Sequence, residues 1–118
     1  MRQGRSTGTP TPAQLHRFAE IQRLGCVCCR LNGDGFVQCE IHHLNEGDHH
    51  GQLRKGHDET VGLCPWHHRG VCRERWTPED MVAAYGPSWE QQPSAFRARY
   101  GGAERLLKYQ DDLLMLWA

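Results

Sequence analysis

Cysteine and histidine are concentrated in one stretch of this chain, and this concentration limits its possible folds more than any other feature. The 118 residues include 6 cysteines and 8 histidines, and all except His16 and Cys72 lie between Cys26 and His68. The chain begins without the apolar segment of a signal peptide, so we expect a cytoplasmic protein with reduced thiols. Clustered cysteine and histidine in that setting indicate metal ligands rather than a three-disulfide secreted domain.

Length and composition indicate one small domain. A chain of 118 residues with 38% hydrophobic residues and a mean hydropathy of -0.71 can bury only a thin core. It has no apolar run of about 18 residues, so no membrane span is expected. The net charge of +0 argues against binding through bulk charge alone. We expect a flexible, mildly basic arm over residues 1–10 and a single zinc-stabilised domain over residues 11–118.

Residues that start and end helices predict the local structure. Threonine followed by proline opens a helix at Thr11 and again at Thr77, and Cys64 with Pro65 gives the same signal. Glycines end these segments. The pattern predicts helices over 12–24, 65–69, 78–85, 94–100 and 103–117, a tight turn at 26–29, a strand over 36–43 and a long loop over 45–60. The leucine-rich stripe of the last helix is predicted to lie in the core or against a partner.

Two short motifs predict a structural zinc site. Cys26-x-x-Cys29 and Cys64-x-x-His67 each place two ligands two residues apart, which is the usual construction of a four-ligand site. Thiolates are soft ligands that select zinc over magnesium. In so small a domain the ion would supply much of the folding free energy. Three other thiols remain alternative ligands, namely Cys28, Cys39 and Cys72. We expect Trp66, between the second pair, to fill the core.

Three further histidines indicate a second metal site. His42 and His43 end the predicted strand, and His68 lies on the predicted helix beside His67. A strand-end histidine pair that faces a helix histidine is typical of a single-metal phosphodiester cleavage centre. In it, His42 and His68 hold the metal and neutral His43 takes a proton from water. The alternative is that these residues are extra zinc ligands or part of a solvated loop.

The order of these motifs resembles the HNH, or ββα-metal, nuclease superfamily. More closely, Gly25–Cys29, Cys39-Glu-Ile-His-His-Leu44, His57 through Leu-Cys-Pro-Trp-His-His to Gly70, and Gly86-Pro-Ser-Trp89 through to Gly101 resemble the phage recombination enhancement nucleases, the Ref family. The resemblance implies an α+β fold, mostly helical, with a ββα-metal core and flanking helices. It also implies a DNA endonuclease of the bacterial cytoplasm that depends on a RecA filament, with structural Zn²⁺ and catalytic Mg²⁺ or Mn²⁺.

The resemblance also assigns roles to single residues. His42 and His68 match the ligands of the catalytic ion, and His43 matches the general base. The middle Asn of the HNH pattern is missing, and we place its role of orienting His43 or closing the loop on Asp58, with His57 as the competitor. The best-known member of the family carries a much longer basic N-terminal segment than the dozen residues found here, in which Arg2 and Arg5 are further candidate phosphate contacts.

A nuclease needs cations that contact the DNA phosphates. Arg54, Lys55 and Arg69 are the candidate DNA-binding cations of the domain. DNA and a RecA filament are the expected partners, and no membrane or organic cofactor is expected. One rival is a non-catalytic zinc module that binds DNA or a protein. Another is a homing or restriction HNH nuclease that acts without RecA.

Overall fold

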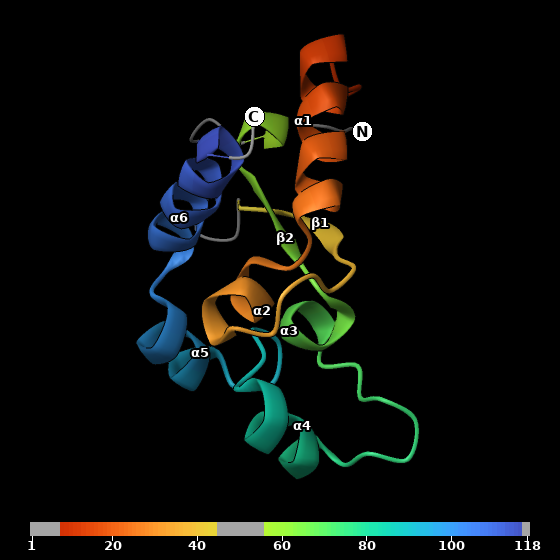
Figure 1. The fold of residues 1–118 in the computed structure, drawn as a ribbon, viewed down its shortest axis with the longest axis vertical. Coiled ribbons are helices and arrows are strands. Elements are labelled where there is room, and N and C mark those ends of the chain that lie inside the picture. Colours follow the sequence, from red (N-terminus) through yellow and green to blue (C-terminus); the bar gives the residue numbers. More distant parts are fainter. Residues whose placement is uncertain (1–7, 45–55, 117–118) are drawn as a thin grey trace.

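The architecture is a small antiparallel hairpin surrounded by helices (Figure 1). The computed structural model describes residues 8–44 and 56–116, and everything below concerns these residues. In chain order the elements are α1 (Pro12–Leu24), α2 (Val27–Asn32), β1 (Glu40–His43), the 3₁₀ helix η1 (Gly56–Asp58), β2 (Thr60–Leu63), α3 (Pro65–Arg69), α4 (Pro78–Tyr85), α5 (Pro93–Tyr100) and α6 (Ala103–Leu116). This is the mostly helical α+β fold that was expected.

The hairpin determines where the candidate site residues lie. Glu40 pairs with Leu63 and His43 pairs with Thr60, so both histidines of β1 lie at the end of the strand. Helix α3 follows β2 after Cys64 alone and packs against both strands. The chain therefore brings the histidines of α3 back beside those of β1.

Helices α1 and α6 enclose β2, which runs between them in Figure 1. The buried side chain of Gln110 on α6 accepts a hydrogen bond from Gly62 N at 2.7 Å and donates one to Thr60 O at 2.9 Å. Arg17 on α1 donates to the same carbonyl at 2.7 Å and pairs with Asp111 at 3.1 Å. The backbone of β2 thus finds its outer partners in side chains of two helices, as buried polar groups require.

The predicted helix starts and ends are confirmed for α1, α3 and α4. Thr11 and Thr77 each form a capping box with the residue three positions further along the chain. In both helices a proline follows the threonine directly, at the first helical position. Cys64 caps α3 through its sulfur, which accepts from the backbone N–H of His67, and Pro65 follows at the first helical position. The conformation of Gly25 ends α1: its φ is 89°, and a Cβ there would lie 2.6 Å from Val37 O. Only glycine fits this turn from helix to cysteine motif.

Three local predictions are wrong. The Cys26–Cys29 segment is not a tight turn, because Cys26 itself caps the helix α2. The strand predicted over 36–43 is limited to Glu40–His43, since its partner β2 has only four residues. In the segment predicted as a loop over 45–60, residues 45–55 lie outside the described part of the chain, whereas Gly56–Asp58 is a 3₁₀ helix and Thr60 opens β2.

The core prediction is confirmed for Trp66 and for most of the apolar stripe of α6. Trp66 is buried and its Nε1 donates to Gly86 O at 2.8 Å, as expected of a core residue. On α6, Leu106 is buried, but Leu116 is 77% exposed. The apolar stripe therefore packs against the core from Leu106 as far as Leu114, and Met115 and Leu116 at its end are exposed. In the part of the chain that is described, we find no helix of the length and apolarity needed to cross a membrane.

Candidate functional site

Four of the predicted zinc ligands meet in a buried cluster. Cys26, Cys29, Cys64 and His67, here called the Cys3His cluster, come from the start of α2 and the start of α3, and their ligand atoms all lie within 4.8 Å of one another. His67 Nδ1 lies 3.4, 3.6 and 3.3 Å from the sulfurs of Cys26, Cys29 and Cys64. The sulfurs of Cys29 and Cys64 are 3.9 Å apart.

These distances fit a tetrahedral zinc site. Bonds of about 2.3 Å to sulfur and 2.0–2.1 Å to nitrogen, at tetrahedral angles, place two sulfurs about 3.8 Å apart and a sulfur and a nitrogen about 3.6 Å apart. Both values agree with the cluster. His67 is also oriented for the task, because its Nε2 donates to Tyr85 O at 2.8 Å and leaves Nδ1 facing the thiols.

The electrostatics of the Cys3His cluster favour a cation. Burial disfavours the Cys26 thiolate, but hydrogen bonds from neighbouring thiols and from His67 outweigh it and hold the pKa of Cys26 well below its ordinary value. The pKa of Cys29 is raised, because its thiol hydrogen-bonds to Cys26 and Cys64 and is buried. Ionisation of one thiol thus disfavours ionisation of the neighbouring thiol. More than one thiolate in the Cys3His cluster would need a positive ion between the sulfurs.

The three alternative ligands lie outside the Cys3His cluster. Cys28 is buried, and burial raises the pKa of its thiol. Cys39 lies against α1 with its sulfur 3.6 Å from Ile21 O, and burial raises its pKa to about 12. Cys72 follows α3 and lines a pocket beside the cluster. The structure therefore brings together the four ligands that the spacing favoured.

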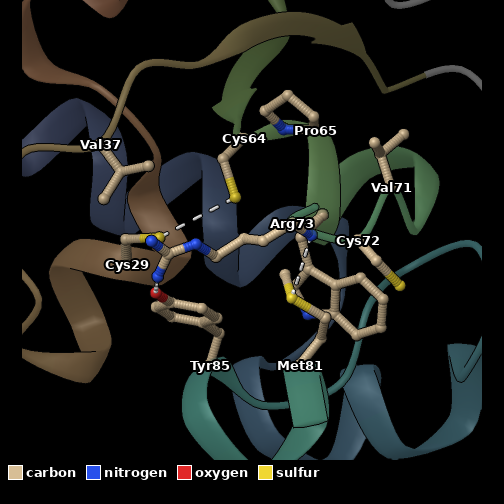
Figure 2. Close-up of a pocket in the computed structure, with 10 residues that line it drawn as sticks. Cys29, Val37, Cys64, Pro65, Val71, Cys72, Arg73, Met81 and Tyr85 are labelled. Atoms are coloured by element: carbon tan, nitrogen blue, oxygen red, sulfur yellow. Dashed lines mark hydrogen bonds between the residues drawn. The ribbon is translucent and has the colours of Figure 1, made fainter. Parts of the chain in front are cut away.

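That pocket is apolar and has a volume of about 420 Å³. Figure 2 shows the thiols of Cys29 and Cys64 on one side of it and Val71 and Met81 on the other. The guanidinium of Arg73 reaches across it and donates to the Tyr85 hydroxyl at 2.8 Å. No histidine of the described residues lines it, so the pocket is separate from the imidazoles described next.

His42 and His68 converge as predicted. His42 Nδ1 lies 3.1 Å from His68 Nε2, and we call these two residues the His42–His68 pair. Two nitrogens bound at right angles to one ion at about 2.1 Å would lie about 3.0 Å apart, so the spacing fits neighbouring positions of an octahedral site. Burial, with the nearby charges of His68 and His43, lowers the pKa of His42 to about 4. His42 is therefore neutral near pH 7, as a metal ligand must be.

A carboxylate supports this pair from behind. Glu40 Oε1 accepts a hydrogen bond from His68 Nδ1 at 2.9 Å, which leaves the lone pair of His68 on Nε2, toward His42. Arg69 holds the same carboxylate through its Nε at 3.0 Å and through a second short contact. The hydrogen bonds from Arg69 and His68 lower the pKa of Glu40 to about 2. A carboxylate behind a ligating histidine is a common arrangement in metal sites.

His43 faces a different neighbour. Its Nε2 lies 2.9 Å from Nδ1 of His57, and the ring of Phe18 lies edge-on to both imidazoles. Burial, together with the charge of His57, lowers the pKa of His43. His43 and His57 form a second pair, and within the described part of the chain no hydrogen bond joins it to the His42–His68 pair. Each pair has one member at the end of β1, namely His42 in one pair and His43 in the other.

The remaining predicted residues have other contacts. Asp58, placed in the role of the missing Asn, accepts from Gln14 Nε2 at 3.1 Å, whereas its neighbour His57 contacts His43. Arg69 is paired with Glu40. The predicted DNA contacts Arg54 and Lys55, and the arm residues Arg2 and Arg5, lie outside the described residues.

Sequence reasoning missed one member of this site, Glu40, and one buried partner of the hairpin, Gln110. Glu40 stands two residues before His42, on the same face of β1, and that spacing is the signal that could have identified it as a partner of the candidate metal ligands. Gln110 breaks the apolar stripe of α6, and a polar residue in such a stripe indicates a buried hydrogen-bond partner.

Comparisons with known proteins place the chain. No curated protein matches it. The family model described as "recombination enhancement, RecA-dependent nuclease" matches residues 10–115, which include the Cys3His cluster and both histidine pairs. The match covers nearly the whole chain, and the family's description names a nuclease. The chain belongs to the family of RecA-dependent recombination enhancement nucleases.

Proposed function

We propose that this protein is a metal-dependent DNA endonuclease of the ββα-metal, or HNH, type. The observation that carries the proposal is the convergence of His42 and His68 at 3.1 Å, with Glu40 hydrogen-bonded behind His68. The order of β1, β2 and α3 supplies the two strands and the helix of such a centre. Two oriented imidazoles fill only two coordination positions of an ion and leave the other positions open to water and phosphate.

The chain's own residues have distinct roles in this mechanism. His42 and His68 hold a divalent ion, Mg²⁺ or Mn²⁺, and Glu40 keeps His68 in the tautomer that can bind it. The bound ion supplies Lewis-acid polarisation of the scissile phosphate and stabilisation of the leaving oxygen. His43 accepts a proton from the attacking water, and its lowered pKa keeps it neutral near pH 7.

A separate zinc ion holds the scaffold in this proposal. Cys26, Cys29, Cys64 and His67 would bind it, because their spacing fits a tetrahedral ion and they are buried. Its role is structural: it joins the start of α2 to the start of α3. Since His67 and His68 are adjacent on α3, zinc binding also fixes the helix that carries His68.

DNA and RecA enter as partners. Arg54 and Lys55, in the segment between the two strands, are the proposed phosphate contacts. Arg69 is engaged by Glu40, so in this proposal it positions the metal site as well as adding positive charge. The family's description supports a target presented on a RecA filament.

The test is nicking of supercoiled plasmid DNA by the zinc-loaded protein, with Mg²⁺ or Mn²⁺ and with or without RecA and ATP. We expect metal-dependent cleavage that His43→Ala abolishes while zinc content and circular dichroism stay unchanged. His16→Ala is the matched control, because that imidazole is 77% exposed on α1. Cleavage by His43→Ala at the wild-type rate would reject the base assignment. Cleavage of free DNA without RecA would favour an ordinary HNH nuclease, and DNA binding without cleavage would favour a zinc module.

A further inference from the structure

His57 occupies an unusual position for a histidine outside the predicted catalytic set. It is 8% exposed, within the 3₁₀ helix η1, and both of its ring nitrogens are engaged. Its Nε2 lies 2.8 Å from the carbonyl oxygen of Gly8, and its Nδ1 lies 2.9 Å from His43 Nε2. His57 therefore bridges the backbone that precedes α1 and the imidazole at the end of β1.

Hydrogen-bond chemistry gives this bridge a direction. A carbonyl oxygen can only accept, so His57 Nε2 must carry a hydrogen and donate it to Gly8. In a neutral imidazole the other nitrogen is then an acceptor, so His57 Nδ1 accepts a hydrogen from His43 Nε2. The lone pair of His43 is left on its Nδ1. The direction of both hydrogen bonds, from His43 to His57 and from His57 to Gly8, therefore follows from the carbonyl of Gly8.

Packing makes the bridge rigid. The ring of Phe18 lies edge-on to His57 with centroids 5.5 Å apart and to His43 with centroids 6.1 Å apart. Phe18 therefore restricts the rotation of both imidazoles. Asp58, the adjacent residue, is bonded to Gln14. Among the described residues, His57 is thus the side chain that can set the tautomer of His43.

We propose that His57 is a positioning residue that holds His43 in the Nε2–H tautomer and so makes Nδ1 of His43 the atom that accepts the proton. The inference rests on the proposed function for its catalytic meaning, but the tautomer itself can be measured without any reaction. A base oriented by a third group is a general feature of such sites, because an imidazole in the wrong tautomer cannot take the proton.

The first test is spectroscopic. The full-length, zinc-loaded protein with isotope-labelled histidine is studied near neutral pH by long-range proton–nitrogen correlation, and the His43 signals are assigned by their loss in His43→Ala. We expect the Nε2–H form of His43 in the wild type. In His57→Leu, which has no acceptor, we expect a mixture of tautomers. In His57→Asn, whose amide oxygen can take the place of Nδ1, we expect the Nε2–H form again.

The second test is kinetic and uses the same variants in the nicking assay. His57→Leu should lower kcat by about 10- to 100-fold, the usual effect of losing a partner of this kind, with KM for DNA unchanged. His57→Asn should recover most of that loss. A merely structural role would lower zinc content or stability in both variants and would not separate kcat from KM.

The outcomes separate the two proposals. If His43 is in the Nδ1–H form in the wild type, or keeps one tautomer in His57→Leu, the positioning role is overturned whether or not the protein cleaves DNA. If the tautomers behave as expected and no variant or wild-type protein nicks DNA under any metal or RecA condition, the nuclease mechanism fails and the bridge stands. Equal kcat in His57→Leu and wild type would also overturn the role.

Discussion

Glu40 Oε1 lies 2.9 Å from Nδ1 of His68, so the carboxylate directs the opposite nitrogen of that imidazole toward His42. The two residues come from β1 and α3, which are 28 positions apart in sequence. The pairing therefore depends on the fold, and specifically on the packing of α3 across both strands. It gives a direct way to test whether the His42–His68 pair binds a metal ion.

Glu40→Gln should weaken binding of the catalytic ion. The amide keeps an acceptor for His68 Nδ1 but loses the charge that strengthens the ligand, so we expect the affinity for Mn²⁺ to fall by about 10- to 100-fold. The measurement is Mn²⁺ binding to the zinc-loaded protein by electron paramagnetic resonance. Glu74→Gln is the control, since that carboxylate is exposed in the segment between α3 and α4. Equal Mn²⁺ affinity in the wild type and Glu40→Gln would contradict the metal site.

Cys26→Ser should prevent stable folding. Structural zinc sites bind with about 10–16 kcal/mol, and a typical domain has a total stability of only about 5–15 kcal/mol. We expect little bound zinc by elemental analysis and little helical circular dichroism. Cys72→Ser is the matched control, because that thiol lines the neighbouring pocket and lies outside the Cys3His cluster. A well-folded, zinc-free Cys26→Ser protein would reject the zinc assignment.

Gln110→Leu should destabilise the domain although leucine fits the apolar stripe. The change removes a donor and an acceptor from buried backbone groups of β2, namely Gly62 N and Thr60 O. Each buried group left without a partner costs about 1–3 kcal/mol. Because Arg17 still donates to Thr60 O, we expect a loss near the lower end of the combined range, about 2 kcal/mol, in urea denaturation. Asp112→Leu on the exposed side of α6 should change stability by less than about 0.5 kcal/mol.

The sequence predicted the helices that begin after Thr11, Cys64 and Thr77, and the Cys3His cluster, because both depend on local chemistry. Thr11, Thr77 and Cys64 act on backbone groups within one turn, and a two-residue spacing between ligands is set within one motif. The spacing also indicated which histidine of the adjacent pair on α3 would join the thiols. These features need no knowledge of the tertiary structure.

The parts that were missed depend on contacts far apart in sequence. Strand β2 has four residues, all buried, with Gly62 in the middle, so it shows no alternation that could identify it. Asp58 and His57 were both candidates for one role, and only the packing of η1 against α1 and β1 places His57 on His43. The partners of β2, Arg17 and Gln110, come from helices at opposite ends of the chain.

The acid limit of activity should lie below the ordinary histidine range. Burial and the neighbouring His57 lower the pKa of His43 from about 6.5, so the neutral, proton-accepting form persists to lower pH than for an exposed imidazole. Activity is present above the pKa of His43 and is lost as the pH falls through it. We therefore expect kcat/KM for nicking, at saturating metal, to fall tenfold per pH unit with a midpoint below pH 6.5.

Phe18→Leu tests the physical cause of this shift. Removing the ring that covers His43 and His57 admits water to both imidazoles and reduces the cost of charging them. The acid midpoint should then move up toward about 6.5, with zinc content unchanged. Leu15→Ala on the same helix is the control, because that side chain is 56% exposed and its loss should leave the midpoint in place. A midpoint above 6.5 in the wild type, or one that falls in Phe18→Leu, would show that burial of His43 does not set the acid limit, since relief of burial can only raise the pKa of an imidazole.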